Sequence, residues 1–205
     1  MTDKELWKWI NKGSWLQDDK TDTEYKYTII DDTLYICFKG STTFVDWLYN
    51  LMIWKKPYKG MKTVWFAHAG FVKKWKAIQT DIFTIIDRVV DFGEINKIII
   101  SGHSQGAGIA TLATEAIWFN YPDLRERIET VLFGSPRAVG FWNFLIIKER
   151  FKNVIRYEQF WDIIPRIPFV LLGYKHIGKR IRIGNPWYKP TLRFTYNHIH
   201  YGDYL

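Results

Sequence analysis

The residues most able to do chemistry are one serine between glycines and, further along the chain, one aspartate and two histidines. Ser104 is the centre of a Gly-His-Ser-Gln-Gly pentapeptide, and Asp162, His198 and His200 follow it. A serine hydroxyl is a weak nucleophile near neutral pH, so it needs a histidine to take its proton and a carboxylate to orient the imidazole. One known arrangement of such triads has the chain order serine, acid, histidine, which is the order found here. The leading hypothesis is therefore nucleophilic catalysis at Ser104.

The elements on either side of Ser104 favour this hypothesis. Residues 97–101 form a short apolar, β-branched run typical of a buried parallel strand, and residues 107–116 are small and helix-forming. A serine at a tight turn between strand and helix is held in strained backbone geometry, and Gly102 and Gly106 let the two elements pass closely. The alternative is an ordinary strand-to-helix turn in which Ser104 is only the helix N-cap.

Asp162 is the acid that the sequence favours. It follows a strand-like run at 153–157 and lies between hydrophobic neighbours, where a carboxylate has little structural reason to be. The alternative is an aspartate that only caps a turn or a helix. For the base, His198 and His200 lie two residues apart, and alternate side chains of an extended segment share a face. Spacing alone leaves both histidines open.

The surrounding pattern predicts an α/β fold with a mostly parallel central sheet flanked by helices. Strand-like runs at 63–67 and 130–133 alternate with a long amphipathic helix at 71–91, which ends at Gly93. A helix at 3–12 is expected on the flank of the domain, without chemistry of its own. At 205 residues and 47% apolar content the chain suits one core, so we predict a single domain over its whole length.

A hairpin near the amino terminus points to a second part of the site. Its strands are predicted at 25–30 and 33–39, and the second strand runs into Gly40 and Ser41. Open α/β sheets keep their sites at the carboxyl ends of their strands. Ser41 is therefore a candidate donor to a developing oxyanion. Beyond residue 168 the alternation of strands and helices gives way to predicted loops rich in glycine, proline and arginine.

The segment 44–58 is the candidate for a lid. Trp47, Leu48, Leu51 and Trp54 recur at helical spacing and are followed by two lysines. One interpretation is a helix packed in the core. The other is an interfacial or lid helix, because aromatic and lysine side chains together suit a bilayer surface.

Composition limits the partners and the location of the protein. The 29 Lys and Arg residues exceed the 21 Asp and Glu residues by 8, which favours transient contact with an anionic membrane or lipid interface. The basic residues are scattered and frame no nucleic-acid motif, so no nucleic-acid partner is expected. The single cysteine, Cys37, is expected to be a buried apolar residue. The charged amino terminus and the lack of a membrane span predict a soluble, cytoplasmic protein.

Taken together, seven ordered motifs resemble those of the class 3 lipases, the fungal-lipase-like branch of the α/β-hydrolases. The resemblance covers residues from about 24 to 205. The motifs are Phe38-Lys39-Gly40-Ser41 with Asp46-Trp47-Leu48, His68-Ala69-Gly70-Phe71, the pentapeptide at 102–106, Phe133-Gly134-Ser135-Pro136-Arg137, Asp162-Ile163-Ile164-Pro165-Arg166, Gly173-Tyr174-Lys175-His176, and His198-x-x-Tyr201.

This resemblance implies a role for each candidate. Ser104 is the expected nucleophile, Asp162 the acid and His198 the base, with an oxyanion hole from Ser41 and the N–H of Gln105. It also implies a lipase or carboxylesterase that acts on lipid esters, either acylglycerols or phospholipid acyl esters, through an acyl-enzyme. No metal or organic cofactor is expected.

Two departures from the family pattern qualify the expectation. Lys39 stands where arginine is usual, and Gln105 where leucine is usual. The chain is also shorter than the secreted fungal enzymes and lacks their cysteines, which argues against a secreted fat-digesting lipase. Two alternatives stay open: a non-catalytic module that binds lipid surfaces on a hydrolase scaffold, and an acyltransferase that uses the same triad. The sequence does not indicate the oligomeric state.

Overall fold

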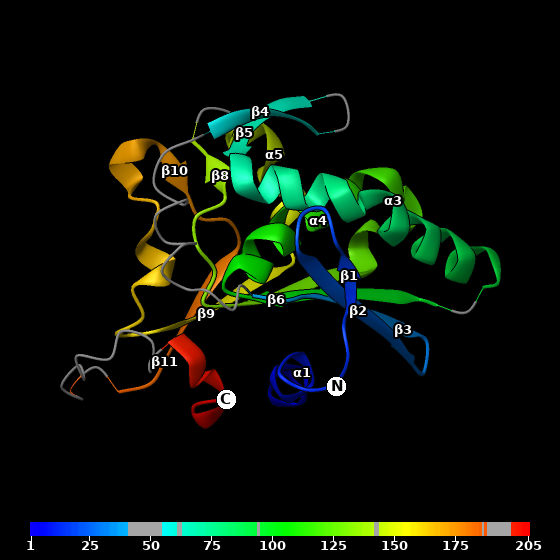
Figure 1. Cartoon of the computed structure of the whole chain (residues 1–205), viewed down its shortest axis with the longest axis horizontal. Coiled ribbons are helices and arrows are strands. Elements are labelled where there is room, and N and C mark those ends of the chain that lie inside the picture. Colours follow the sequence, from blue (N-terminus) through cyan, green and yellow to red (C-terminus); the bar gives the residue numbers. More distant parts are fainter. Residues whose placement is uncertain (41–54, 61–62, 94, 142–143, 186, 188–197) are drawn as a thin grey trace.

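A computed structural model describes residues 1–40, 55–60, 63–93, 95–141, 144–185, 187 and 198–205. Its centre is a seven-stranded sheet in the order β1-β2-β3-β6-β7-β9-β11. Helices α3 and α4 cover one face of this sheet, while α1 and the C-terminal segment lie on the other face (Figure 1). The chain therefore forms three layers, with the sheet in the middle.

The strands of the main sheet are β1 (Leu16–Asp18), β2 (Thr23–Ile30), β3 (Thr33–Phe38), β6 (Lys97–His103), β7 (Ile128–Phe133), β9 (Val154–Gln159) and β11 (Lys179–Ile183). A second sheet, in the order β10-β8-β5-β4, consists of β4 (Lys55–Gly60), β5 (Thr63–His68), β8 (Val139–Gly140) and β10 (Tyr174–Lys175). The α-helices are α1 (Asp3–Ile10), α3 (Ala69–Asp91), α4 (Gln105–Asn120) and α5 (Phe144–Ile147). The 3₁₀ helices are Pro122–Arg127, Lys148–Phe151, Ile164–Arg166, Val170–Leu172 and Tyr201–Asp203.

The prediction of a mostly parallel sheet is confirmed. β3, β6, β7, β9 and β11 run parallel to one another, and only β1 and β2 are antiparallel to their neighbours. Phe38 pairs with Gly102, His103 with Phe133, and Phe133 with Tyr157 across neighbouring strands. The carboxyl ends of β3, β6, β7 and β9 therefore meet at one edge of the sheet, as a site at that edge requires.

Each face of the sheet has its own apolar cluster. The larger cluster joins the sheet to α3 and α4, and it includes the fully buried side chains of Trp75, Ile78 and Ile100. The smaller one, on the α1 face, includes Trp7 and Tyr201. The helix α3 ends as predicted, because Gly93 has a φ of 66° and donates its N–H to the carbonyl of Val90.

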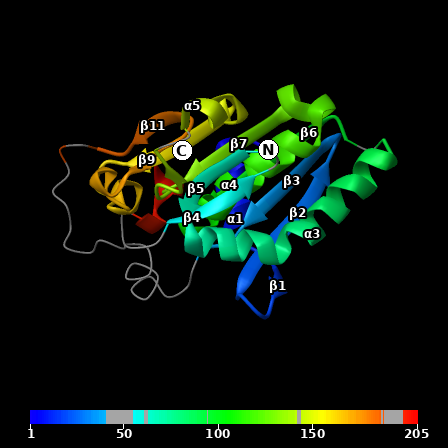
Figure 2. The same cartoon turned by 90° about the horizontal axis from the view of Figure 1, so that it is seen from above.

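Two regions differ from the sequence-based expectation. Residues 55–58 of the expected lid are part of β4, which pairs antiparallel with β5, and the Tyr58 ring is buried against Trp65. The rest of the lid segment lies outside the described residues. Figure 2, seen from above, shows β4 and β5 beside α3. Residues 55–58 form a strand because they pair with β5, and no local pattern in the Lys-Lys-Pro-Tyr stretch indicates this pairing.

The second difference is at the other edge of the main sheet, where loops were predicted after residue 168. Residues 179–183 form β11, which pairs in parallel with β9. The stretch Lys-Arg-Ile-Arg-Ile alternates charged and apolar residues, the period of a strand with one face on a core. The stretch was predicted as a loop because it is rich in basic residues. None of the helices in the described part of the chain is long and apolar enough to cross a bilayer.

Candidate functional site

Ser104 lies in the sharp turn between β6 and α4. Its φ of 57° and ψ of −123° place a residue with a side chain in a backbone region that such residues rarely occupy. Ser104 occupies the N-cap position of α4, but its side chain makes no cap hydrogen bond to the helix. The Ser104 N–H donates to the Phe133 carbonyl at 3.0 Å, which ties the turn to β7. This is the geometry of a nucleophile elbow.

The glycines around Ser104 are required by close backbone contacts. A side chain at Gly102 would collide with the backbone of Gly106, and one at Gly106 would collide with the carbonyl group of Phe38 at the end of β3. The absence of both side chains allows α4 to begin directly against the carboxyl end of the sheet. Gln105 is the first residue of α4, so its N–H has no acceptor within the helix.

Asp162 follows β9 and is 1% exposed. Its Oδ1 accepts a hydrogen bond from the Ile164 N–H at 2.9 Å, while its Oδ2 accepts from the Tyr201 hydroxyl at 2.7 Å. The same Oδ2 lies 2.8 Å from Nδ1 of His198. Burial, then the nearby Asp162 charge, raises the pKa of Tyr201 well above its usual value, so the phenol stays protonated and donates.

His198 is the histidine that Asp162 contacts. It is 3% exposed, and because Nδ1 faces a carboxylate, this nitrogen carries the proton and donates it. His103, the neighbour of Ser104, packs against the His198 ring with the two ring planes tilted by 32° and their centroids 4.5 Å apart. His103 Nε2 also donates to the His198 carbonyl at 2.7 Å. The turn that carries Ser104 therefore holds the His198 segment directly. His200, two residues further on, is half-buried.

Gly134 makes room for the acid and the histidine. It follows β7 with a φ of 55°, and a Cβ there would lie 2.9 Å from Cε1 of His198 and 3.0 Å from Oδ2 of Asp162. A side chain at this position would therefore displace the Asp162–His198 pair. The motif around residues 133–137 was identified in the sequence, but this role depends on a contact with residues far along the chain.

Helix α1 supports the site from below, although the sequence predicted no chemistry for it. The Trp7 ring packs edge-on against His103 at 4.9 Å and lies 5.5 Å from Tyr201. Trp7 thus contacts two of the side chains that position His198 and Asp162. No signal in the sequence of α1 identifies this contact, because it depends on the return of the C-terminal segment to the α1 face.

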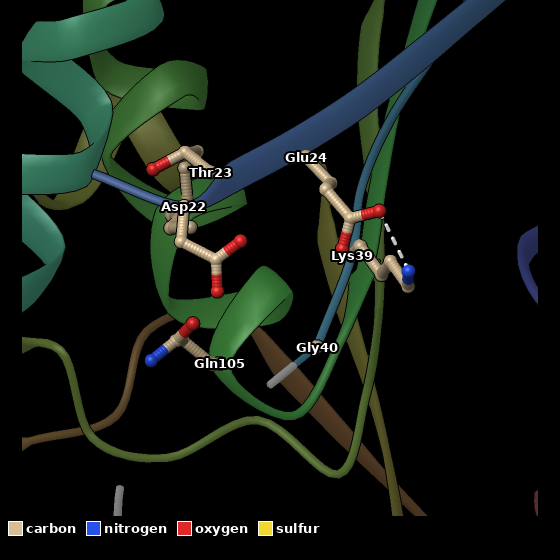
Figure 3. A pocket seen from close by; sticks show the side chains of 7 residues that line it. Asp22, Thr23, Glu24, Lys39, Gly40 and Gln105 are labelled. Carbon is tan, nitrogen blue, oxygen red and sulfur yellow. Dashed lines mark hydrogen bonds and ion pairs between the residues drawn. The ribbon is translucent and has the colours of Figure 1, made fainter. Parts of the chain in front are cut away.

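A small polar recess adjoins the beginning of α4 (Figure 3). The Asp22 and Gln105 side chains lie on one side of it, and the Glu24 carboxylate pairs with the Lys39 ammonium at 2.7 Å on the other. Both unusual residues of the motif pattern, Lys39 and Gln105, thus line one recess. Ser41, the other expected oxyanion donor, lies outside the described residues.

The structure thus brings most of the predicted site residues to one edge of the sheet. Asp162 and His198 are hydrogen-bonded, and Ser104 follows His103, whose ring packs against that of His198. Gln105 is the first residue of α4 and follows Ser104 directly. Sequence reasoning missed the contributions of His103, Tyr201 and Trp7. Tyr201 had a signal in the His-x-x-Tyr motif, whereas His103 was noticed only as part of the pentapeptide.

Comparison with known proteins identifies the family. The model of the class 3 lipase family matches residues 35–172. A lipase of Rhizopus niveus is 26% identical over 192 residues, which cover 84% of this chain and 47% of the relative. The secreted mono- and diacylglycerol lipase A of Penicillium cyclopium is 28% identical over 165 residues, which cover 78% of this chain and 52% of the relative. The chain thus spans about half the length of these curated relatives.

The solved structures agree on the fold. Lipase II from Rhizopus niveus superposes with a TM-score of 0.75 at 23% identity, covering 87% of this chain and 69% of that one. The likeness identifies the architecture as an α/β-hydrolase fold. Because the family model matches more than half of the chain, this protein belongs to the class 3 lipase family.

Proposed function

We propose that this protein hydrolyses carboxylic esters of lipids through a covalent acyl-enzyme. In this proposal Ser104 is the nucleophile, His198 the general base and Asp162 the residue that orients the imidazole. Ser41 and the N–H of Gln105 are the proposed oxyanion donors. The observation that carries the proposal is the buried Asp162–His198 hydrogen bond beside a serine in strained elbow geometry.

The first half of the reaction forms the acyl-enzyme. Because Nδ1 of His198 keeps its proton in a hydrogen bond to Asp162, Nε2 carries the lone pair that removes the proton from the Ser104 hydroxyl. The Ser104 oxygen then attacks the ester carbonyl, and the carbonyl oxygen becomes an anion. The N–H at the beginning of α4 is suited to stabilise this charge, and the positive end of the helix dipole adds to it.

The second half releases the products. The imidazolium of His198 gives its proton to the departing alcohol, and the C–O bond of the ester breaks to leave an acyl group on Ser104. Water then attacks this acyl group while His198 accepts its proton, so the fatty acid leaves and the serine hydroxyl is restored. Transfer of the acyl group to an alcohol would use the same intermediate with an alcohol in place of water.

The buried carboxylate argues against a binding module without activity. A surface-binding scaffold has no need for a carboxylate that is 1% exposed and accepts three hydrogen bonds, one of them from a histidine. Burying a carboxylate is unfavourable unless hydrogen bonds offset its lost hydration. The arrangement is therefore better explained by catalysis than by a scaffold role.

Lipid esters are the proposed substrates for two reasons. The family is named for lipases, and the Penicillium cyclopium relative is named a mono- and diacylglycerol lipase. In addition, the four residues 169–172, Phe-Val-Leu-Leu, follow the Asp162 loop and are 52%, 61%, 99% and 44% exposed. An exposed apolar run beside a site suits contact with a lipid surface, and the net charge of +8 favours an anionic one.

The test is hydrolysis of a series of esters that differ in acyl-chain length and headgroup, each in soluble and emulsified form. Ser104→Ala should lose roughly 10⁴- to 10⁶-fold in turnover on every ester that the wild type cleaves. Ser135→Ala is the matched control, because it removes another buried hydroxyl near the carboxyl edge of the sheet and should retain turnover within a few fold. A Ser104→Ala protein that folds and keeps most of its activity would refute the proposal.

A further inference from the structure

The strands β8, β9, β10 and β11 lie toward one end of the molecule (Figure 1), and residues on and beside them line a second concave site. It is a cavity of about 490 Å³ between the β9–β11 edge of the main sheet and the Val170–Leu172 turn. This volume is in the range of sites for small ligands. Ser104, Asp162 and His198 do not line it, so the cavity is separate from the proposed catalytic residues.

The cavity wall has a strong excess of positive charge. Four cationic side chains line it, against the single carboxylate of Glu158: those of Arg137, Arg156, Lys175 and Arg180. His176 also lines it, and burial, followed by the charge of Arg156, lowers its pKa well below the usual value, so its ring is neutral near pH 7. The positive charge therefore comes from guanidinium and ammonium groups, which stay charged at neutral pH.

Arg156 is the central cation of the wall. It is 4% exposed, its Nε–H donates to the Ile177 carbonyl at 2.5 Å, and Nη1 pairs with Glu158. These bonds use two of the five N–H donors of a guanidinium, and no further bond from Arg156 to a described residue is present. Arg180 is its neighbour on β11, directly paired in register, and is exposed.

Clustering these cations has an electrostatic cost that an anion would offset. Desolvation by burial lowers the pKa of both Arg137 and Arg156, with Glu158 acting in the opposite direction in each case. The two guanidinium groups have thus lost hydration, and in its place they have backbone carbonyls and the single negative charge of Glu158. A concave surface with one sign of charge concentrates counter-ions of the other sign.

We propose that this cavity binds the phosphate group of a phosphomonoester. A phosphate dianion matches the excess of cations, and its oxygens suit the donor fork of Arg156 together with Arg180. Val170 lines the cavity and leads to Leu171, which is 99% exposed, so the rim can accept the organic part of the ligand. The ligand is either a soluble phosphate ester or the headgroup of a lipid such as a phosphatidic acid.

The cavity is connected to the loop that carries Asp162. Arg137 donates to the carbonyls of Arg166 and of Pro168, and His176 Nε2 donates to the Pro165 carbonyl at 2.6 Å. Residues 164–166 form the 3₁₀ helix whose first N–H bonds to Asp162. A bound phosphate would therefore lie against side chains that hold the acid loop in place.

Two binding measurements near neutral pH test the proposal. The first titrates the whole chain with glycerol phosphate, using glycerol as the uncharged control, and follows binding by calorimetry. The second measures sedimentation with phosphatidylcholine vesicles that contain either phosphatidic acid or phosphatidylserine, in a Ser104→Ala background that prevents turnover. Arg180→Gln is the test variant, since Arg180 is exposed and its replacement should leave the fold intact. Lys179→Gln is the matched control, because it removes the same charge from the adjacent position on the opposite face of β11.

A soluble ligand would be supported by saturable binding of glycerol phosphate to the wild type. The affinity should be about tenfold weaker in Arg180→Gln and within twofold of wild type in Lys179→Gln. Preference for phosphatidic acid over phosphatidylserine with the same dependence on Arg180, without binding of glycerol phosphate, would support a lipid headgroup. Equal losses in the two variants, no loss in Arg180→Gln, or no binding in either measurement would overturn the proposal. None of these outcomes depends on ester hydrolysis.

Discussion

Strand β9 and the loop after it bury two carboxylates that have opposite surroundings. Asp162, 1% exposed, is held by a backbone N–H, a phenol and an imidazole. Glu158, four residues earlier and 8% exposed, is paired with the guanidinium of Arg156. The first carboxylate has only donors that are uncharged in the resting state, whereas the second has a permanent cation beside it.

The difference decides whether the negative charge of a carboxylate is available to stabilise an imidazolium or is compensated by a permanent cation. The negative charge of Asp162 stays available to stabilise an imidazolium on His198, because no cation among the described residues pairs with it permanently. At Glu158 the negative charge is compensated by Arg156, and the other cations that line the same cavity provide a surplus of positive charge. In our proposal Asp162 serves catalysis, whereas Glu158 compensates the charge of Arg156.

The largest effect is expected from removing the negative charge of the first carboxylate. Asp162→Asn should lower turnover on a soluble ester by about 10⁴-fold, because an amide would no longer hold His198 with its proton on Nδ1 or stabilise the imidazolium. Steady-state kinetics on one soluble ester measure this loss. Turnover within tenfold of wild type would mean that Asp162 is not the acid of the triad.

Removing the second carboxylate should affect stability instead. Glu158→Gln leaves the buried Arg156 without its counter-charge, so the free energy of unfolding should fall by about 3 kcal/mol. Glu129→Gln is the matched control, because its pair with Lys97 is exposed at 35% and 48% and should be worth less than about 1 kcal/mol. Denaturant unfolding measures both. Equal changes in the free energy of unfolding in the two variants would contradict the claim that the buried Arg156–Glu158 pair matters more than a surface pair.

A smaller effect is expected on the pH dependence of stability, through one neutral histidine near each carboxylate. Burial lowers the pKa of His103 and of His176 well below 6.5. Below pH 6.5 the unfolded chain therefore binds protons at these positions that the native state does not, so stability falls as the pH falls and is recovered above pH 6.5. Each histidine contributes a slope of about 1.4 kcal/mol per pH unit below that value.

The variant His103→Gln isolates one of the two contributions. It keeps a donor for the His198 carbonyl, so the slope of stability against pH between pH 5 and pH 6 should decrease by about 1.4 kcal/mol per unit. Urea unfolding at several pH values provides the slope. If the slope stays that of the wild type, His103 is protonated in the native state and our description of its environment is wrong.

Much of this site could be predicted from the sequence because its parts follow strands with clear local patterns. The apolar run before Ser104 and the small residues after it encode strand, turn and helix within 20 positions. Residue spacing does not distinguish His198 from His200 as the base, whereas the family motif His-x-x-Tyr favours His198. His198 is the histidine whose Nδ1 lies 2.8 Å from Oδ2 of Asp162, and it remains our proposal for the base.

The features that the sequence did not reveal depend on contacts between distant segments. Tyr201 reaches Asp162 across 39 positions, and Trp7 contacts His103 from the other end of the chain. The same holds for β4 and β11, whose strand character is set by pairing with β5 and β9. The basic cavity was also missed, because Arg137, Arg156 and Arg180 are scattered in sequence and gather only when β11 pairs with β9.

The most direct test of the central claim is covalent labelling by a nitrophenyl alkylphosphonate, which reacts as an ester and stays on the nucleophile. Peptide mass spectrometry should locate one label per chain on Ser104. The rate of labelling should fall by about 10³-fold or more in His198→Ala and remain near that of the wild type in His200→Ala. A label on another residue, no label at all, or a loss in His200→Ala alone would contradict the triad proposed for this protein.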